Sequence, residues 1–157
     1  MTDFMDEYAA FFGYPVILIK YHNNELAGSI KQVKGGDWID LRAAETVEMK
    51  ASDYRLISLG ISVRLPMGYE AHIAPRSSTF QNFGILQTNG VAVIDESYCG
   101  DDDVWRYPAL AMRDTVIHKG DRICQFRIMR KMGPVSIEET DHLSDKSRGG
   151  FGSTGIV

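Results

Sequence analysis

Apolar and polar residues alternate with a period of two over much of the chain, which is the pattern of half-buried β-strands. The clearest alternation covers 59–65 and 69–73, and the turn residues Pro66-Met67-Gly68 join these two segments. The continuous apolar run 16–19 also has the length of a strand, whereas 122–128 alternates less regularly. Short strands separated by turn signals predict an all-β fold, a jelly-roll-like β-barrel or sandwich.

Two helices are expected beside these strands. Residues 2–13 predict an N-terminal helical extension, spanning 1–13, that begins at Thr2 and ends at Gly13. Its aromatic residues share one face, at the spacing i, i+4, i+7 and i+8: Phe4, Tyr8, Phe11 and Phe12. This face would pack on the body or on a sister subunit, or else dock another protein.

The second helix is internal and short, from Ser78 to Phe83, with Ser77 as its cap and Gly84 at its end. After the segment 122–128, Val135 and Ile137 predict the start of another short strand. The glycine-rich segment 147–157 cannot hold one conformation alone, so it is either a plain flexible end or a flexible C-terminal flap.

Composition narrows the class of protein. The 157 residues are 44% hydrophobic and 24% charged, which is typical of one soluble globular domain, here 1–157. A net charge of −4 disfavours binding to nucleic acid or to anionic membranes. No apolar run approaches the ~20 residues that span a bilayer, and no basic secretory leader is visible. Two cysteines support neither a disulfide framework nor a zinc site, so a cytoplasmic location is expected.

One stretch, 88–101, organises the candidate chemistry. Asn89-Gly90 suits a tight turn, the run 91–94 forms a short strand, and Asp95 follows at the end of that strand. Taken alone, this stretch would be a hairpin with a turn aspartate. Four other motif-like stretches in the chain change that interpretation.

In chain order the five stretches are G-D-W-I-D-L-R-A (36–43), A-P-R-S-S-T-F (74–80), N-G-V-A-V-I-D-E-S-Y-C-G (89–100), K-G-D-R-I-C-Q-F (119–126) and R-G-G-F-G-S-T-G (148–155). Their content, order and spacing resemble the five motifs of the trimeric dUTP pyrophosphatases (dUTPases). The residues within these stretches are most similar to those of dUTPases of Bacillus-type bacteria and their phages. The resemblance implies hydrolysis of dUTP to dUMP and pyrophosphate by a homotrimer, with each active site shared by three subunits. It also implies Mg²⁺ on the triphosphate and attack of water on the α-phosphorus.

The resemblance assigns roles to residues of the 89–100 stretch. Asp95 matches the general base that deprotonates the attacking water, its alternative being a turn-capping aspartate. Tyr98 matches the ring that packs on deoxyribose and leaves no room for a 2′-hydroxyl; otherwise it is a core tyrosine. The base and sugar are expected on the arm itself, at Asn89, Gly90, Val93, Ile94 and Tyr98. Backbone N–H and C=O groups there would read uracil, although Asn89 would also serve as a plain turn residue.

The phosphate chain is assigned to two other motifs. Arg76, Ser77 and Ser78 precede the internal helix, where free backbone N–H groups and a guanidinium would meet phosphate. Gln125 matches a hydrogen-bond donor to the phosphates, or else is an ordinary strand glutamine. Asp40 matches an aspartate near the Mg²⁺ and its water shell, or else a structural turn residue.

The tail would supply the remaining contacts. Phe151 matches the ring that stacks over uracil, and Ser153 and Thr154 match further phosphate donors. For the γ-phosphate, Arg148 has the right chemistry, but the register of many family members favours Lys146. Closure of such a flap would exclude water from the reacting centre.

Residues 101–108, D-D-D-V-W-R-Y-P, are an insertion relative to the shorter common pattern. We expect a solvated loop there, with Trp105 and Tyr107 at a trimer contact or in a lid over a neighbouring subunit. Two other functions are compatible with the motifs. One is a dCTP deaminase of the same fold, whose chemistry needs a glutamate at the cytosine C4 edge, and Glu96 is the one glutamate on the arm. The other is a non-catalytic nucleotide-binding regulator.

Overall fold

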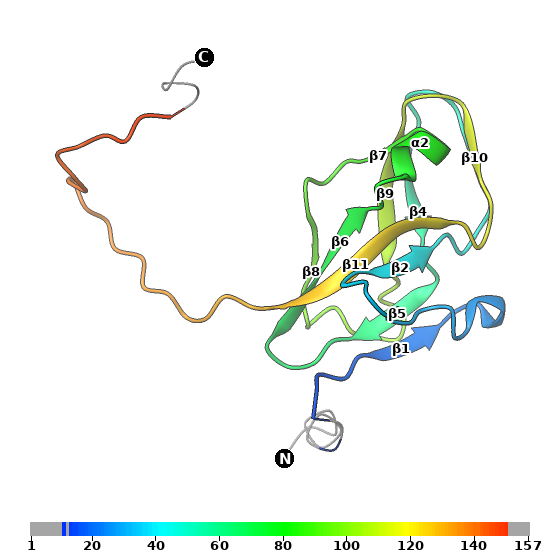
Figure 1. Ribbon diagram of the computed structural model, residues 1–157, viewed down its shortest axis with the longest axis horizontal. Helices are drawn as coiled ribbons and strands as arrows, with labels where there is room; N and C mark the ends of the chain where they lie inside the picture. The colour runs from blue at the N-terminus through cyan, green and yellow to red at the C-terminus, as the bar shows by residue number, and fades with distance from the viewer. Residues whose placement is uncertain (1–10, 12, 151–157) are drawn as a thin grey trace.

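The computed structural model describes residue 11 and residues 13–150 of the chain, and the regular secondary structure within them is almost wholly β-strand (Figure 1). The elements are β1 (Leu18–Tyr21), η1 (Asn24–Leu26), β2 (Ile39–Arg42), β3 (Val47–Met49), β4 (Tyr54–Ser58), β5 (Ile61–Arg64), β6 (Tyr69–Pro75), α2 (Thr79–Phe83), β7 (Ile85–Gln87), β8 (Ala92–Ile94), β9 (Arg106–Ala111), β10 (Thr115–Ile117) and β11 (Arg122–Arg130). The all-β class with a short internal helix, expected from the sequence, is confirmed.

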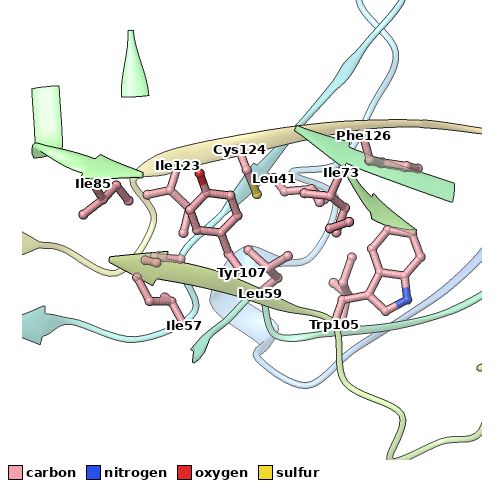
Figure 2. Packing of buried hydrophobic residues seen from close by; sticks show 14 of the residues in the cluster. Leu41, Ile57, Leu59, Ile73, Ile85, Trp105, Tyr107, Ile123, Cys124 and Phe126 are labelled. Carbon is pink, nitrogen blue, oxygen red and sulfur yellow. The ribbon is translucent and has the colours of Figure 1, made fainter. Parts of the chain in front are cut away.

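The strands form two larger sheets and two ribbons, and every pairing is antiparallel. The larger sheets have the strand orders β2-β11-β6-β8 and β4-β9-β7, and the ribbons pair β1 with β5 and β3 with β10. Side chains from both larger sheets meet in one hydrophobic core, where Ile73 and Phe126 from the first face Ile57 and Tyr107 from the second (Figure 2). This packing of one sheet on another is the sandwich arrangement that the alternating pattern predicts.

The nine-residue β11 is one of the two inner strands of the four-stranded sheet, and it has a β-bulge near its start. The register with β2 shifts between Arg122 and Cys124, so that Ile123 is an extra residue. Ile123 and Cys124 are consequently both buried. The bulge explains the irregular alternation of this segment, and it places Arg122 on the same face of the sheet as Gln125.

The expectation for the insertion 101–108 is wrong for its second half. Trp105 and Tyr107 are 1% and 0% exposed, and Trp105 packs edge-on against Phe126 with ring centroids 5.3 Å apart. Both aromatics belong to the core, not to a surface lid or a subunit contact. The solvated turn is limited to the acidic residues at 101–103 and its backbone returns to the body where Trp105 N–H donates to the Ile61 carbonyl.

The ends of the chain depart from the sequence prediction in two ways. The first strand lies over Leu18–Tyr21, two residues beyond the apolar run 16–19. The strand expected at Val135 and Ile137 is absent from the described residues, because the segment 131–150 runs away from the body with no neighbouring strand to pair with (Figure 1). The N-terminal helix expected over 2–13 lies almost wholly outside the described residues.

In the described part of the chain, no helix has the length and apolar character required to span a bilayer.

Candidate functional site

Three charged side chains from different strands form one cluster at the end of the four-stranded sheet. Asp40 on β2 accepts from Arg76 Nε at 2.7 Å and from Arg122 Nη1 at 3.1 Å. Arg76 directly follows β6, and its Nη1 donates to the Arg122 carbonyl at 3.4 Å. Asp40 therefore holds two guanidinium groups side by side, and both retain exposed surface for an anion.

Gln125 lies beside this cluster because β11 pairs with β2 and β6 at the same point. It is directly opposite Asp40 on one side and Ala74 on the other. Its side-chain amide donates to the Pro75 carbonyl at 3.0 Å, which fixes the orientation of the amide at the foot of the Arg76 loop. Three of the sequence-predicted residues, Asp40, Arg76 and Gln125, are thus brought together, and Arg122 joins them.

Sequence reasoning missed Arg122, although it stands within the fourth of the five stretches. Strict alternation puts Arg122 and Gln125 on opposite faces of a strand, and only the bulge brings them to one face. The signal available in the sequence was the irregular alternation of 122–128 itself, which is typical of a bulge.

Ser77 and Ser78 occupy the turn that leads into α2, but neither is the side-chain cap of that helix. The N-cap position belongs to Ser78 and not to the predicted Ser77, and Ser78 makes no side-chain capping bond. The buried Thr79 makes the side-chain bonds of this turn: its Oγ1 accepts from the Arg76 N–H at 2.8 Å and donates to the Ile123 carbonyl at 3.0 Å. Thr79 thereby fastens the Arg76 loop to β11. At the other end, Gly84 adopts φ +64, as expected for a helix C-terminus.

We expect Thr79→Val to destabilise the fold by about 1–3 kcal/mol, because a partly buried N–H and a buried C=O lose their partner with little change in side-chain shape. Urea denaturation would measure the loss. Ser78→Ala is the matched comparison and should change the free energy of unfolding by less than about 0.5 kcal/mol. A larger effect at Ser78 than at Thr79 would contradict this account of the turn.

A thiol lies directly beneath the cluster. Cys124 is fully buried, and burial together with the nearby Asp40 carboxylate raises the pKa of its thiol. The second cysteine, Cys99, is half-buried on the 89–100 arm, and both thiols are free.

The 89–100 arm borders a separate cavity of about 400 Å³. On the arm side its lining is Asn89, Ala92, Val93, Ile94, Asp95 and Tyr98, and on the body side it is Tyr54, Leu56, Ile73, Val104, Trp105, Arg106 and Pro108. Asp95 is an exposed carboxylate at the edge of this cavity, one residue after β8. Gly90 lies in the same arm without lining the cavity.

The backbone of the arm sets the relation between Asp95 and Tyr98. The Tyr98 N–H donates to the Asp95 carbonyl at 3.1 Å, which closes a tight turn between them. The Tyr98 hydroxyl donates to the Val104 carbonyl at 3.5 Å, while the residue as a whole remains 43% exposed. Tyr98 is therefore a surface ring anchored at its tip, not a core tyrosine.

The arm and the arginine cluster are two separate surfaces of one chain. None of Arg76, Ser77, Ser78 and Gln125 is among the described residues that line the arm cavity. Arg148 lies in the exposed tail, which leaves the body after β11 (Figure 1). Phe151, Ser153 and Thr154 lie outside the described residues. The described residues also contain no group of three or more His, Cys, Asp or Glu side chains that would hold a metal ion.

Comparison with known proteins identifies the family. The family model described as dUTPase matches residues 36–155, which begin at the first of the five stretches and end at the last. The chain belongs to the dUTPase family.

Two dUTPases show how close individual relatives are. The SPbeta prophage-derived deoxyuridine 5′-triphosphate nucleotidohydrolase YosS of Bacillus subtilis (strain 168) is 58% identical over 139 residues, which cover 88% of this chain and 97% of that protein. The deoxyuridine 5′-triphosphate nucleotidohydrolase of Neorickettsia sennetsu is 34% identical over 143 residues, covering 88% and 95%. The resemblance seen in the sequence motifs is thus confirmed.

Solved dUTPase structures share the fold. The Staphylococcus bacteriophage 80alpha dUTPase with dUPNHPP superposes with a TM-score of 0.71 at 20% identity, covering 90% of this chain and 99% of that one. The dUTPase of phage phi11 of S. aureus, whose structure reveals the coordination of a structural Mg(II) ion, gives a TM-score of 0.68 at 15% identity, covering 83% and 99%. At these identities the similarity concerns the fold alone.

Proposed function

We propose that Asp95 is the general base with which this dUTPase converts dUTP to dUMP and pyrophosphate. The observation that carries the proposal is the position of one exposed carboxylate at the edge of the arm cavity, in a turn with Tyr98. Asp95 would take a proton from a water molecule as the water oxygen bonds to the α-phosphorus. The bond from that phosphorus to the bridging oxygen then breaks, and pyrophosphate leaves. General-base catalysis of this kind contributes roughly 10²–10⁴-fold to the rate.

The arm would select the nucleoside. Asn89, Gly90, Val93 and Ile94 would present their backbone N–H and C=O groups to uracil, in a space that a 5-methyl group does not fit. Tyr98, anchored at its hydroxyl and exposed along its ring, would pack on the deoxyribose. The 2′-hydroxyl of a ribonucleotide would then clash with that ring, so ribonucleotides would be excluded.

The arginine cluster would bind the triphosphate. Arg76 and Arg122 present two guanidinium groups, with Gln125, Ser77 and Ser78 as neutral donors around them. Planar guanidinium forks match phosphate oxygens in pairs, so two adjacent forks suit a polyphosphate chain. The net charge of −4 supports the same conclusion, because only a local cluster would attract an anion to this protein.

A homotrimer would bring the arm of one subunit to the cluster of another. Within the described part of one chain, no residue of the arginine cluster lines the arm cavity. The outer face of β4-β9-β7 is apolar and uncovered, with Tyr54, Leu56 and Leu86 between 43% and 54% exposed. Tyr54 and Leu86 both pair with Leu110, so these side chains form one continuous patch. Burial of such a patch between copies would drive the assembly.

The C-terminal segment 147–157 would close over the bound nucleotide. Phe151 would stack on uracil, and Arg148, Ser153 and Thr154 would contact the phosphates. The exposed course of 131–150 away from the body supports this role, because such a segment reaches surfaces beyond its own core (Figure 1).

We also propose that Mg²⁺ reaches the site with the nucleotide. Magnesium bound to the phosphates would neutralise charge that builds up on the leaving pyrophosphate. The residues present fit this mode of binding, since magnesium keeps several waters and takes one or two carboxylates plus phosphate oxygens. Asp40 is the carboxylate nearest the cluster, and it would act through the metal's waters. The free thiols of Cys99 and Cys124 fit the expected cytoplasmic setting.

The two contacts of Asp40 predict the effect of its removal. We expect Asp40→Asn to raise the KM for dUTP about tenfold at saturating Mg²⁺, because Arg76 and Arg122 lose the charge that holds them side by side. Steady-state kinetics at several Mg²⁺ concentrations would measure it. A KM that returns to the wild-type value at high Mg²⁺ would instead mean that Asp40 works only through the metal.

One assay separates the competing functions. The enzyme is incubated with dUTP and with each of the four common dNTPs in the presence of Mg²⁺, while pyrophosphate and ammonia are followed. Pyrophosphate from dUTP alone is expected. Ammonia from dCTP would establish a deaminase, an outcome disfavoured by Glu96, whose carboxylate is engaged with Gly68 and Lys131. Tight dUTP binding without turnover would establish the non-catalytic regulator.

A further inference from the structure

Three distant segments of the chain meet at the side chain of Glu96, the residue after Asp95. Its Oε2 accepts from the Gly68 N–H at 2.6 Å, and its Oε1 accepts from Lys131 Nζ. The Lys131 N–H in turn donates to the Gly68 carbonyl at 2.9 Å. One carboxylate therefore joins the arm, the β5–β6 turn and the end of β11, and we call this group the Glu96 clamp.

The clamp stands where the backbone pairing of the arm stops. β8 is a three-residue edge strand, and its ladder with β6 ends at the pair Ile94 and Ala71. Asp95 is the first residue beyond that ladder. The Gly68 amide, which lies beyond the same end of the ladder on the partner strand, bonds to the Glu96 side chain instead of to backbone. Asp95 is thus held on one side by the sheet and on the other by the clamp.

The electrostatics of the clamp favour a fixed geometry. The hydrogen bond from Lys131, followed by that from Gly68, lowers the pKa of the Glu96 carboxyl, so the group is ionised at neutral pH. The Glu96 and Lys131 side chains are only 29% and 40% exposed. Charge-assisted hydrogen bonds of this kind are shorter and more directional than neutral ones. Gly68 adopts φ +78, a left-handed conformation that suits glycine in this turn.

We propose that Glu96 is a positioning residue for Asp95, fixing the direction in which the Asp95 carboxylate leaves the arm. The inference rests on the proposed role of Asp95 as the general base. Glu96 itself touches no reacting atom: its carboxylate is turned toward Gly68 and Lys131. The clamp matters for catalysis because a base that is misplaced by about 1 Å loses roughly 100-fold in rate.

The test compares three variants of the full-length enzyme. Glu96→Ala removes the clamp, Glu96→Gln keeps a neutral acceptor for Gly68, and Lys131→Met removes the second partner alone. We expect kcat for dUTP to fall roughly 10- to 100-fold in Glu96→Ala, with KM within about threefold of wild type. Smaller losses of kcat are expected for the other two variants. The loss should fall on kcat because the clamp would contact neither the uracil nor the phosphates of the nucleotide.

Lys50→Met is the matched control, because it breaks another exposed lysine–carboxylate pair, the 2.9 Å contact with Asp114 on the β3–β10 ribbon. Its kcat should equal that of wild type. Thermal unfolding of every variant separates loss of fold from loss of geometry. Should Glu96→Ala fail to fold, Glu96→Gln and Lys131→Met carry the test.

Three results would overturn the inference: full kcat in the clamp variants, a loss confined to KM, or an equal loss in Lys50→Met. These are distinct from failure of the proposed function. If wild type does not hydrolyse dUTP, or if Asp95→Asn retains full turnover, the role of Asp95 is wrong. If Asp95→Asn is inactive while Glu96→Ala is fully active, only the clamp inference falls.

Discussion

Asp95→Asn is expected to lower kcat for dUTP hydrolysis by roughly 10²–10⁴-fold while KM stays within a few-fold. Asparagine keeps the shape of the side chain but cannot accept the proton of the attacking water. The nucleotide would still be bound by the arm and the arginine cluster, so the loss should fall on the chemical step. Pyrophosphate release under saturating dUTP and Mg²⁺ measures it.

Asp102→Asn provides the control, because Asp102 is an exposed aspartate in the turn that follows the arm. Its turnover should match wild type, and both variants should unfold at the wild-type temperature. Full turnover in Asp95→Asn would remove this residue from the mechanism and return it to the role of a turn aspartate.

Truncation after Ser147 is the second large effect we expect. Loss of Arg148, Phe151, Ser153 and Thr154 should reduce kcat/KM by roughly 100-fold or more, because the flap would no longer order the nucleotide or exclude water. The fold should remain intact, since the described tail residues contribute nothing to the hydrophobic core. Steady-state kinetics and thermal unfolding of the truncated enzyme test both halves of this prediction.

Two point variants refine the truncation. Arg148→Met should reproduce much of the loss, and Lys146→Met should not, if the arginine is the γ-phosphate contact. The reverse order would support the register that favours Lys146. Unchanged kcat/KM in the truncated enzyme would mean that the segment is a plain flexible end.

The strands that the sequence predicted best are those whose two faces differ. Over 69–73, inward Ala71 and Ile73 alternate with more exposed neighbours, and β6 covers that segment. The segment 59–65 is buried on both faces, since Leu59, Ser62 and Val63 are all inside. Its alternating pattern had predicted that one face would be exposed to solvent. Alternation records which residue types are present, and tertiary packing decides which faces are covered.

Pro108 lies within β9, whose first three residues fall in the segment expected to be a solvated loop. Pro108 lacks an N–H and argues against an interior strand, yet it stands in the middle strand of β4-β9-β7. The ladder between β7 and β9 ends at the pair Gln87 and Ala109, and Pro108 lies just beyond it, so no N–H from Pro108 is needed on that side. Its carbonyl still accepts from the Thr88 N–H at 3.1 Å. The position of the neighbouring strand end cannot be deduced from the local sequence.

In the candidate site, too, the sequence identified individual residues but not the contacts between distant segments. The motifs identified Asp40, Arg76 and Gln125 as site residues. They did not indicate that Asp40 would pair with Arg122, which is 82 positions away. Glu96 was conspicuous only as an acid on the arm, because its partners, Gly68 and Lys131, come from segments with no motif of their own. Contacts between distant segments require the fold, whereas the residues that make them stand out by type and spacing.

The two cysteines differ in accessibility, so that one of them can be labelled selectively. Cys124 is sealed inside the sheet and its thiol is held protonated, whereas Cys99 is partly open to solvent, one residue after Tyr98. A maleimide dye would therefore attach at one place in the unaltered chain, on the arm that is proposed to grip the nucleotide. Fluorescence from that label would follow the arrival and departure of ligand without any engineered attachment point.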